Sequence, residues 1–353
     1  MAFDKILTII IPSYNMEKYL PKCLGSLIVA PELMERIEVI VVNDGSTDRT
    51  SEIAHEFAAN YPQTFKVIDK SNGHYGSCIN TALPIAVGTF IKILDADDTF
   101  DTISFEKLIL HLDSLPVDTD MIMTDYATVN DEGVQIGICS YPLPTDKFLC
   151  AKDLVDYKCG MAMHAVCYRR ALLIDIGYHQ TEGLPYTDTE WFYLPPAKCK
   201  KIYYYPICLY RYLLGRPGQS VDKAVWVTSP SIGKLESIFS GMVFTYERVM
   251  HDASYEKLYI EFQLCRMLNL LIELNDLYAN IGSAITFFHN LSKLCYRHPF
   301  LYDVMDRFVV FSSLRIRFKY VRFMIMHKWA VRGVIIGTRV YRKLLKLLWI
   351  GGR

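Results

Sequence analysis

Three carboxylates stand close together within residues 88–98, where an apolar segment leads into Asp95, Asp97 and Asp98. Residues 90–94 have the pattern of a buried strand, so the acids follow its carboxyl end. In an open α/β sheet the ligand crevice lies at that end of the strands. Neighbouring acids repel one another unless a cation neutralises them, and Mg²⁺ typically joins one or two carboxylates to substrate phosphates. The segment therefore indicates a metal–phosphate site. The simpler alternative is a solvated acidic turn that caps the next helix.

Polar side chains also follow two earlier strands. Residues 6–11 form a continuous, mostly β-branched run, and residues 37–42 form a second one. Because strands alternate with helical patterns, we expect βαβ units and a mostly parallel sheet. No G-x-G-x-x-G follows the first strand, so a dinucleotide-binding fold would lack its phosphate loop. Three polar strand ends at one edge favour a ligand crevice over a purely structural sheet; they carry Tyr14, Asp44 and Asp95.

The remaining elements are expected from hydrophobic spacing. A helix over 53–59 has Ser46 or Thr47 as its expected cap, and His164 is interpreted as a structural histidine. The other expected segments are helices near 20–27, 79–86 and 151–157, a helix that begins near 187, strands at 65–68, 201–205 and 208–213, a hairpin within 121–140, and helices from about 230 onward.

Length and composition permit two domains. The chain has 353 residues, of which 51% are hydrophobic, enough for a sizeable core. Its ten cysteines show no C-x-x-C pair, and the amino terminus shows no signal peptide, so we expect a reducing cytoplasm and no disulfide framework. No uncharged apolar run reaches the length of about 18 residues that suggests a membrane span.

Charge is distributed unevenly, although the formal net charge is zero. The first 306 residues carry 26 basic and 38 acidic side chains, whereas residues 307–353 carry twelve Lys or Arg and no Asp or Glu. Large apolar residues alternate with these cations, which suits an amphipathic helix on an anionic membrane surface. A partner helix is the second interpretation. A nucleic-acid-binding tail is the least favoured interpretation, because the large apolar residues of 340–350 need burial rather than phosphate. We expect no nucleic-acid partner, and peripheral attachment to the inner face of the membrane.

Four motifs occur in a recognisable order: P-S-Y-N at 12–15, N-D-G-S-T-D at 43–48, N-G at 72–73 and D-A-D-D at 95–98. They resemble the family 2 glycosyltransferases with the GT-A fold, specifically over residues 1–100 and more weakly to about residue 222. The resemblance implies an α/β fold, a nucleotide-binding αβα sandwich with a mostly parallel sheet, followed by an α-helical C-terminal region. The implied divisions are a GT-A domain at 1–222 (nucleotide-binding half 1–100, acceptor-side half 101–222), a helical region at 223–306 and a basic tail at 307–353.

The resemblance also assigns a donor site. Pro12, Tyr14 and Asp44 match positions that hold the nucleotide base, with Asp44 accepting a hydrogen bond from uracil. Asp95 and Asp97 match the DxD motif, which binds ribose and a Mn²⁺ or Mg²⁺ ion on the donor diphosphate, and Asp98 is a third candidate ligand. The other donor-side candidates are Asn15, Asn72, Gly73, His74, Asn80 and Ala96.

Two later segments complete the implied site. The family's catalytic base lies in a Glu-Asp pair before an aromatic residue, and here Thr187 stands in place of the Glu. The base is therefore either Asp188 or Glu190, and we favour Asp188; its alternative role is helix capping. A carboxylate suits the task of removing a proton from an attacking hydroxyl. A later loop resembles the one that closes over the donor diphosphate, and it carries Arg216, Gln219 and Ser220.

The implied reaction is an inverting, metal-assisted transfer from a UDP-sugar to a hydroxyl of a saccharide or lipid-linked acceptor, in cell-surface polysaccharide synthesis. Two other classes stay open. A nucleotidyltransferase acting on a sugar phosphate also uses paired acids, but it would carry a Gly-rich basic loop after its first strand. A non-catalytic, membrane-associated scaffold would not need the acidic motif or Asp188. The sequence is compatible with an oligomer.

Overall fold

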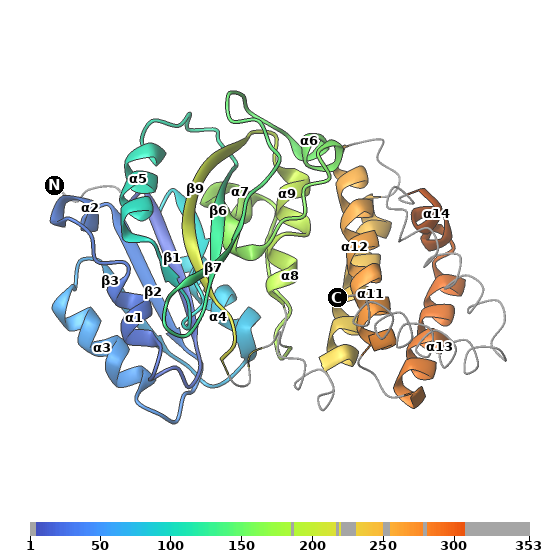
Figure 1. The fold of residues 1–353 in the computed structure, drawn as a ribbon, viewed down its shortest axis with the longest axis horizontal. Coiled ribbons are helices and arrows are strands. Elements are labelled where there is room, and N and C mark those ends of the chain that lie inside the picture. Colours follow the sequence, from blue (N-terminus) through green and yellow to red (C-terminus); the bar gives the residue numbers. More distant parts are fainter. Residues whose placement is uncertain are drawn as a thin grey trace, which may run out of the picture. The chain divides into compact units, whose positions relative to one another are not determined.

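The computed structural model describes residues 5–184, 187–216, 219, 231–249, 255–277 and 281–307. Ser220 and the basic tail from residue 308 lie outside these residues. The chain divides into two compact units, Met1–Arg216 and Pro217–Arg353. The first holds a nine-stranded sheet with helices packed on it, and the second is helical (Figure 1).

The first half of the sheet is parallel, as expected. Its strand order is β3-β2-β1-β4, and every residue of β2 is buried, as in a sheet covered on both faces. These strands are β1 (Leu7–Ser13), β2 (Ile37–Asn43), β3 (Phe65–Asp69) and β4 (Phe90–Ile93). The connecting helices are α1 (Leu20–Gly25), α2 (Pro31–Met34), α3 (Thr50–Asn60), α4 (His74–Ala82) and the 3₁₀ turn η1 (Leu83–Ile85).

The second half of the sheet is mixed. β8 is antiparallel to β4 and β6, β7 is antiparallel to β6, and β9 runs parallel to β6 and antiparallel to β5. These strands are β5 (Thr99–Phe100), β6 (Met121–Val129), β7 (Gln135–Cys139), β8 (Val166–Arg169) and β9 (Ile202–Leu213). The two strands expected at 201–205 and 208–213 are thus one strand. Its register with β6 jumps from Tyr205 to Cys208, across Pro206, which has no N–H for the ladder.

Along the chain, the helices of the second half alternate with these strands. They are α5 (Thr102–Leu112), α6 (Ala151–Asp156), the 3₁₀ turn η2 (Met163–Ala165), α7 (Arg170–Asp175), α8 (Asp188–Trp191) and α9 (Leu194–Lys198). Asp101 caps α5 through a 3.0 Å hydrogen bond from Ser104 N to its carboxylate. Phe105 of α5 and Leu24 of α1 share one core cluster with Ile9 of β1, so these helices cover one face of the sheet.

The second unit confirms the helical prediction. It contains α11 (Ser231–Val249), α12 (Tyr255–Leu277), α13 (Ile281–Arg297) and α14 (Phe300–Arg307). α12 contacts the other three helices. One stripe of α12 is buried, and it consists of Ile260, Leu264, Met267, Leu268 and Leu271. Among the described residues, no helix is long and apolar enough to cross a membrane.

The expected cap of α3 is wrong. Asp48, rather than Ser46 or Thr47, accepts a hydrogen bond from the first turn, from Thr50 N at 3.0 Å. Asn15 N donates to Ser46 Oγ at 3.0 Å, and Thr47 N donates to Asn15 Oδ1 at 2.9 Å. These polar groups bond across to the loop after β1 instead of to their own helix. The loops after β1 and β2 are therefore latched together.

A glycine sets the close approach of α4 to the segment before α8. A Cβ on Gly76 would lie 2.2 Å from the carbonyl oxygen of Thr181 and 3.0 Å from Gln180 Cβ. We expect Gly76→Ala to lower the free energy of unfolding by about 1–3 kcal/mol, because backbone must shift to admit the methyl group. Denaturant unfolding followed by circular dichroism measures this change.

The matched control is Gly25→Ala, at the end of α1, where a Cβ would meet nothing within 4 Å. That substitution should be neutral or slightly stabilising, since Ala is the better helix former. Equal stability of the two variants would contradict the close approach.

Candidate functional site

The N-terminus of α4 joins the ends of two strands. Gly73 N donates to Asp44 Oδ1 at 2.9 Å, just beyond β2. Tyr75 Oη donates to Asp95 Oδ1 at 2.9 Å, just beyond β4. Between them His74 adopts φ +65°, a left-handed conformation uncommon for a residue other than glycine and often found at functional sites. One short loop therefore brings the predicted base-binding and metal-binding acids into a single region.

Asp44 is held in place by two donors. Its carboxylate is buried, and Oδ1 accepts a further hydrogen bond from Lys70 Nζ at 2.7 Å. Nearby, Pro12 is half-buried on β1, whereas Tyr14 is 48% exposed. Asn15 serves in the latch between the loops after β1 and β2. An exposed aromatic ring and a fixed carboxylate are the groups that stacking on a planar base and hydrogen bonding to it require.

Strand β9 fixes the acidic turn. The hydroxyl of Tyr210 donates to Asp98 Oδ2 at 2.7 Å and accepts from Asp95 N at 3.1 Å. The backbone N–H of Leu213 donates to Asp98 Oδ1 at 2.7 Å. Both oxygens of buried Asp98 thus accept hydrogen bonds from β9. Asp98 therefore anchors the turn that also carries the carboxylates of Asp95 and Asp97.

The carboxylates of the turn destabilise one another. Burial raises the pKa of Asp95 well above its usual range, and the negative charges of Asp97 and Asp188 raise it further. Burial also raises the pKa of Asp98. Asp97 meets a cation, with Arg216 Nε 2.5 Å from its Oδ2. This donor set fits a hard divalent cation, because oxygen ligands and crowded negative charge are what such an ion requires.

His164 supplies a second candidate ligand set. One of its ring nitrogens lies within 4.8 Å of carboxylate oxygens of Asp95 and Asp98. Its Nδ1 is buried and meets no hydrogen-bond partner among the described residues, and burial lowers the pKa of the ring to about 3. The ring stacks on Tyr212 at 4.2 Å between centroids. Lys92, also buried, donates to the carbonyl oxygen of His164 at 2.9 Å. The structure thus places this predicted structural histidine beside the acids.

The two candidate bases occupy different settings. Glu190 accepts hydrogen bonds from both N and Oγ1 of Thr181, each at 2.7 Å, so its two oxygens hold the segment before α8. Asp188 is the first residue of α8, and burial raises its pKa to about 6, against the opposing effect of backbone hydrogen bonds from Thr189 and Asp188 itself. The charge of Asp188, and not that of Glu190, is among the causes that raise the pKa of Asp95 in the acidic turn.

The other predicted donor-side residues lie in different settings, and not all of them are near the acidic turn in the described contacts. Asn80 clamps the segment before α8: its Nδ2 donates to the carbonyl of Gln180 at 2.8 Å and to Glu182 Oε1 at 2.9 Å. Asn72 is exposed beside the α4 N-terminus, and Ala96 is buried within the acidic turn. Arg216 ends the first unit; of the two remaining loop residues, Gln219 is buried and Ser220 lies outside the described residues.

Residues 8–176 match the family model "Glycosyl transferase family 2". These residues form a family 2 glycosyltransferase domain. The crystal structure of S. aureus TarS 1-349 in complex with UDP-GlcNAc has the same fold, with a TM-score of 0.68, 21% identity, and coverage of 95% of this chain and 91% of that one. The GT-A fold inferred from the motifs is confirmed.

Two curated relatives each match about a third of this chain. An uncharacterized glycosyltransferase of Mycoplasma pneumoniae (the MG025 homolog) is 37% identical over 113 residues, which are 31% of this chain and 38% of that protein. The minor teichoic acid biosynthesis protein GgaB of Bacillus subtilis is 33% identical over 121 residues, 34% of this chain and 13% of its own length. The chain thus spans well under two thirds of these relatives.

Several residues that build the family 2 site were not predicted. Tyr75 stands within a loop that the motifs had marked, so its position beside Asn72 and Gly73 was an available signal. Tyr210 and Lys92 have no such signal, because their partners are residues distant in sequence; the Tyr210 bond to Asp98 joins residues 112 positions apart. Only the folded chain reveals them, because it brings Tyr210 of β9 to Asp98 and Lys92 of β4 to the carbonyl oxygen of His164.

Proposed function

We propose that this chain transfers a sugar from a UDP-sugar to a hydroxyl group of an acceptor during synthesis of a cell-surface polysaccharide. The observation that carries the proposal is a pair of hydrogen bonds from the α4 N-terminus. Gly73 N donates to Asp44, and the Tyr75 hydroxyl donates to Asp95. This pair sets a carboxylate for base recognition beside a carboxylate cluster for a diphosphate. The family 2 domain, the UDP-GlcNAc complex of TarS and the teichoic acid role named for GgaB support the same substrate class.

Asp188 is the proposed base. As the acceptor oxygen attacks the anomeric carbon, its proton passes to the Asp188 carboxylate, and the bond from the anomeric carbon to the UDP oxygen breaks with its electron pair. One base and one displacement invert the anomeric centre. A pKa of about 6 leaves this carboxylate ionised, yet basic, near neutral pH.

The proposed cation site consists of Asp95 and Asp97, with Asp98 as the residue that orients them. Asp98 already accepts two hydrogen bonds from β9, whereas Asp97 pairs with the side chain of Arg216. A bound Mn²⁺ or Mg²⁺ offsets the charge that develops on a leaving nucleoside diphosphate. Arg216 is then placed to contact phosphate oxygens, for which a guanidinium has paired donors.

Nucleotide binding tests this arrangement without any acceptor. We expect UDP to bind more tightly in the presence of Mn²⁺, because the cation joins the diphosphate to the acids. Asp97→Ala should reduce that gain at least about tenfold, by loss of a charged ligand. Calorimetric titration with UDP measures the affinity, and electron paramagnetic resonance of free Mn²⁺ measures metal uptake independently.

Two further variants separate the candidate ligand sets. His164→Ala should leave metal-dependent UDP affinity near that of the parent chain, because we assign the cation to Asp95 and Asp97. Asp146→Asn, at an exposed loop position, controls for the change in net charge. Loss of Mn²⁺ uptake in His164→Ala with retention in Asp97→Ala would move the ion to the set that contains the histidine.

Catalysis distinguishes Asp188 from Glu190. Asp188→Asn should lower the rate of transfer from a UDP-sugar by about 10²–10⁴-fold with UDP affinity retained, since the base acts only in the chemical step. Glu190→Gln should lower the rate less, because it weakens one contact with Thr181 and keeps an acceptor oxygen.

Initial rates over a pH series check the same assignment. The parent rate should rise as pH increases through about 6, where the carboxylate loses its proton. A pH-independent rate, or a larger loss in Glu190→Gln, would exclude Asp188.

Attachment to a membrane through residues 307–353 is a further part of the proposal. Its support is the twelve basic and no acidic side chains of that segment. Removing residues 307–353 should release the protein from vesicles that contain anionic lipid, measured by co-sedimentation. Vesicles of neutral lipid are the control. Undiminished binding of the shortened chain to anionic vesicles would refute the role of the tail.

A further inference from the structure

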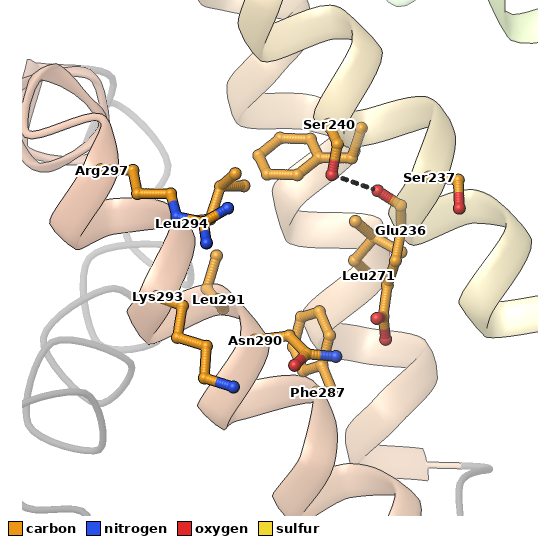
Figure 2. A pocket seen from close by; sticks show the side chains of 11 residues that line it. Glu236, Ser237, Ser240, Leu271, Phe287, Asn290, Leu291, Lys293, Leu294 and Arg297 are labelled. Atoms are coloured by element: carbon orange, nitrogen blue, oxygen red, sulfur yellow. Dashed lines mark hydrogen bonds between the residues drawn. The ribbon is translucent and has the colours of Figure 1, made fainter.

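A cavity of about 300 Å³ opens within the second unit, and the proposed reaction does not use it. Its walls come from α11 and α13, with Leu271 of α12 between them (Figure 2). This volume is at the lower end of the range for small-molecule sites, about 300–1,000 Å³. All of its lining residues belong to one compact unit, so the cavity is a property of the helical unit itself.

The floor of the cavity is apolar. Phe239, Leu271, Phe287 and Leu291 line it, and each is at most 3% exposed in the folded chain. These side chains offer carbon surface and no hydrogen-bonding groups. A ligand that fills the floor therefore gains free energy by bringing hydrocarbon out of water.

One wall of the cavity is cationic. Lys293 and Arg297 stand one turn apart on α13, and both are exposed. No ion pair involves either of them within the part of the chain that the structure describes. Like charges four residues apart on a helix destabilise each other, so an anion shared between the two would be stabilising. Phosphate oxygens suit such a pair, because a guanidinium and an ammonium both donate to them.

The acid of the cavity lies on the other wall. Glu236 projects from α11, whereas Lys293 and Arg297 project from α13 (Figure 2). Its carboxylate accepts a hydrogen bond from Asn290, and burial raises its pKa. Among the described residues, no ion pair joins Glu236 to Lys293 or Arg297, so the acid does not neutralise the two cations directly. This polarity gives a bound ligand one favourable orientation, with its anionic end at α13.

We propose that this cavity binds a phosphorylated lipid, with the phosphate between Lys293 and Arg297 and the start of the hydrocarbon chain on the floor formed by Phe239, Leu271 and Phe287. The match of charge at the wall and of apolar surface at the floor selects an amphiphile over a free anion or a neutral detergent. The site is independent of the donor site in the first unit, and binding to it requires no sugar transfer.

Decyl phosphate, below its critical micelle concentration, is the probe. Calorimetric titration of the full chain should show saturable binding at least about tenfold tighter than that of decyl glucoside or of inorganic phosphate, because only decyl phosphate satisfies wall and floor together. The double variant Lys293→Gln/Arg297→Gln should weaken decyl phosphate binding at least about tenfold. Glu236→Gln should strengthen it, since one negative charge is removed.

Arg248→Gln is the matched control, because it removes an exposed cation of α11 that does not line the cavity. It should change the affinity less than about twofold. Ser240→Leu places bulk in the cavity and should weaken decyl phosphate binding while leaving the helical circular dichroism signal intact. Equal affinity for decyl glucoside, or an equal effect of Arg248→Gln and the double variant, would overturn the proposal. Decyl phosphate binding without UDP binding would leave this inference standing and remove the proposed donor site.

Discussion

The structure of the first unit depends on one electrostatic constraint. Three aspartates follow a single buried strand, and the repulsion among their carboxylates must be offset. Each of them has its own partner from a different element. Tyr75 donates to Asp95, Arg216 pairs with Asp97, and β9 supplies two donors to Asp98. A turn that bears so much charge is retained because α4, β9 and the end of the first unit all converge on it.

The mixed half of the sheet also takes part in holding the acidic turn. A parallel sheet buries its strands on both faces and leaves only its edge for a ligand. Strand β9 does not pair with β4, yet its Tyr210 reaches the acidic turn and bonds to both Asp95 and Asp98. The mixed half of the sheet thus supplies the two donors to Asp98. Pro206 divides the pairing of β9 with β6, so the part of the strand that carries Tyr210 follows its own register.

The sequence allowed the parallel half, the helical C-terminal region and the acidic turn to be predicted, because each is encoded by neighbours in the chain. Buried strands appear as β-branched runs, and the D-A-D-D motif is contiguous. The predicted caps Ser46 and Thr47 failed for the opposite reason: their polar atoms had partners in a distant loop, at Asn15. His164 was interpreted as structural because no local pattern places it beside Asp95. Side chains whose partners lie a hundred residues away are fixed by packing, and only the folded chain identifies them.

The raised pKa values of the site connect its chemistry to its stability. Where folding raises the pKa of a carboxyl group, the folded chain binds the proton more tightly than the unfolded chain does. The contribution to stability is then complete below the unfolded pKa, and it is lost as pH rises through the folded value. For Asp188 that loss runs from the ordinary pKa of 3.8 to the folded pKa of about 6, and for Asp95 it extends to higher pH. Near neutral pH the site therefore opposes folding, and the rest of the unit stabilises it. A divalent cation in the proposed site would replace those protons and offset that cost, so the ion that would serve the proposed diphosphate chemistry would also stabilise the fold.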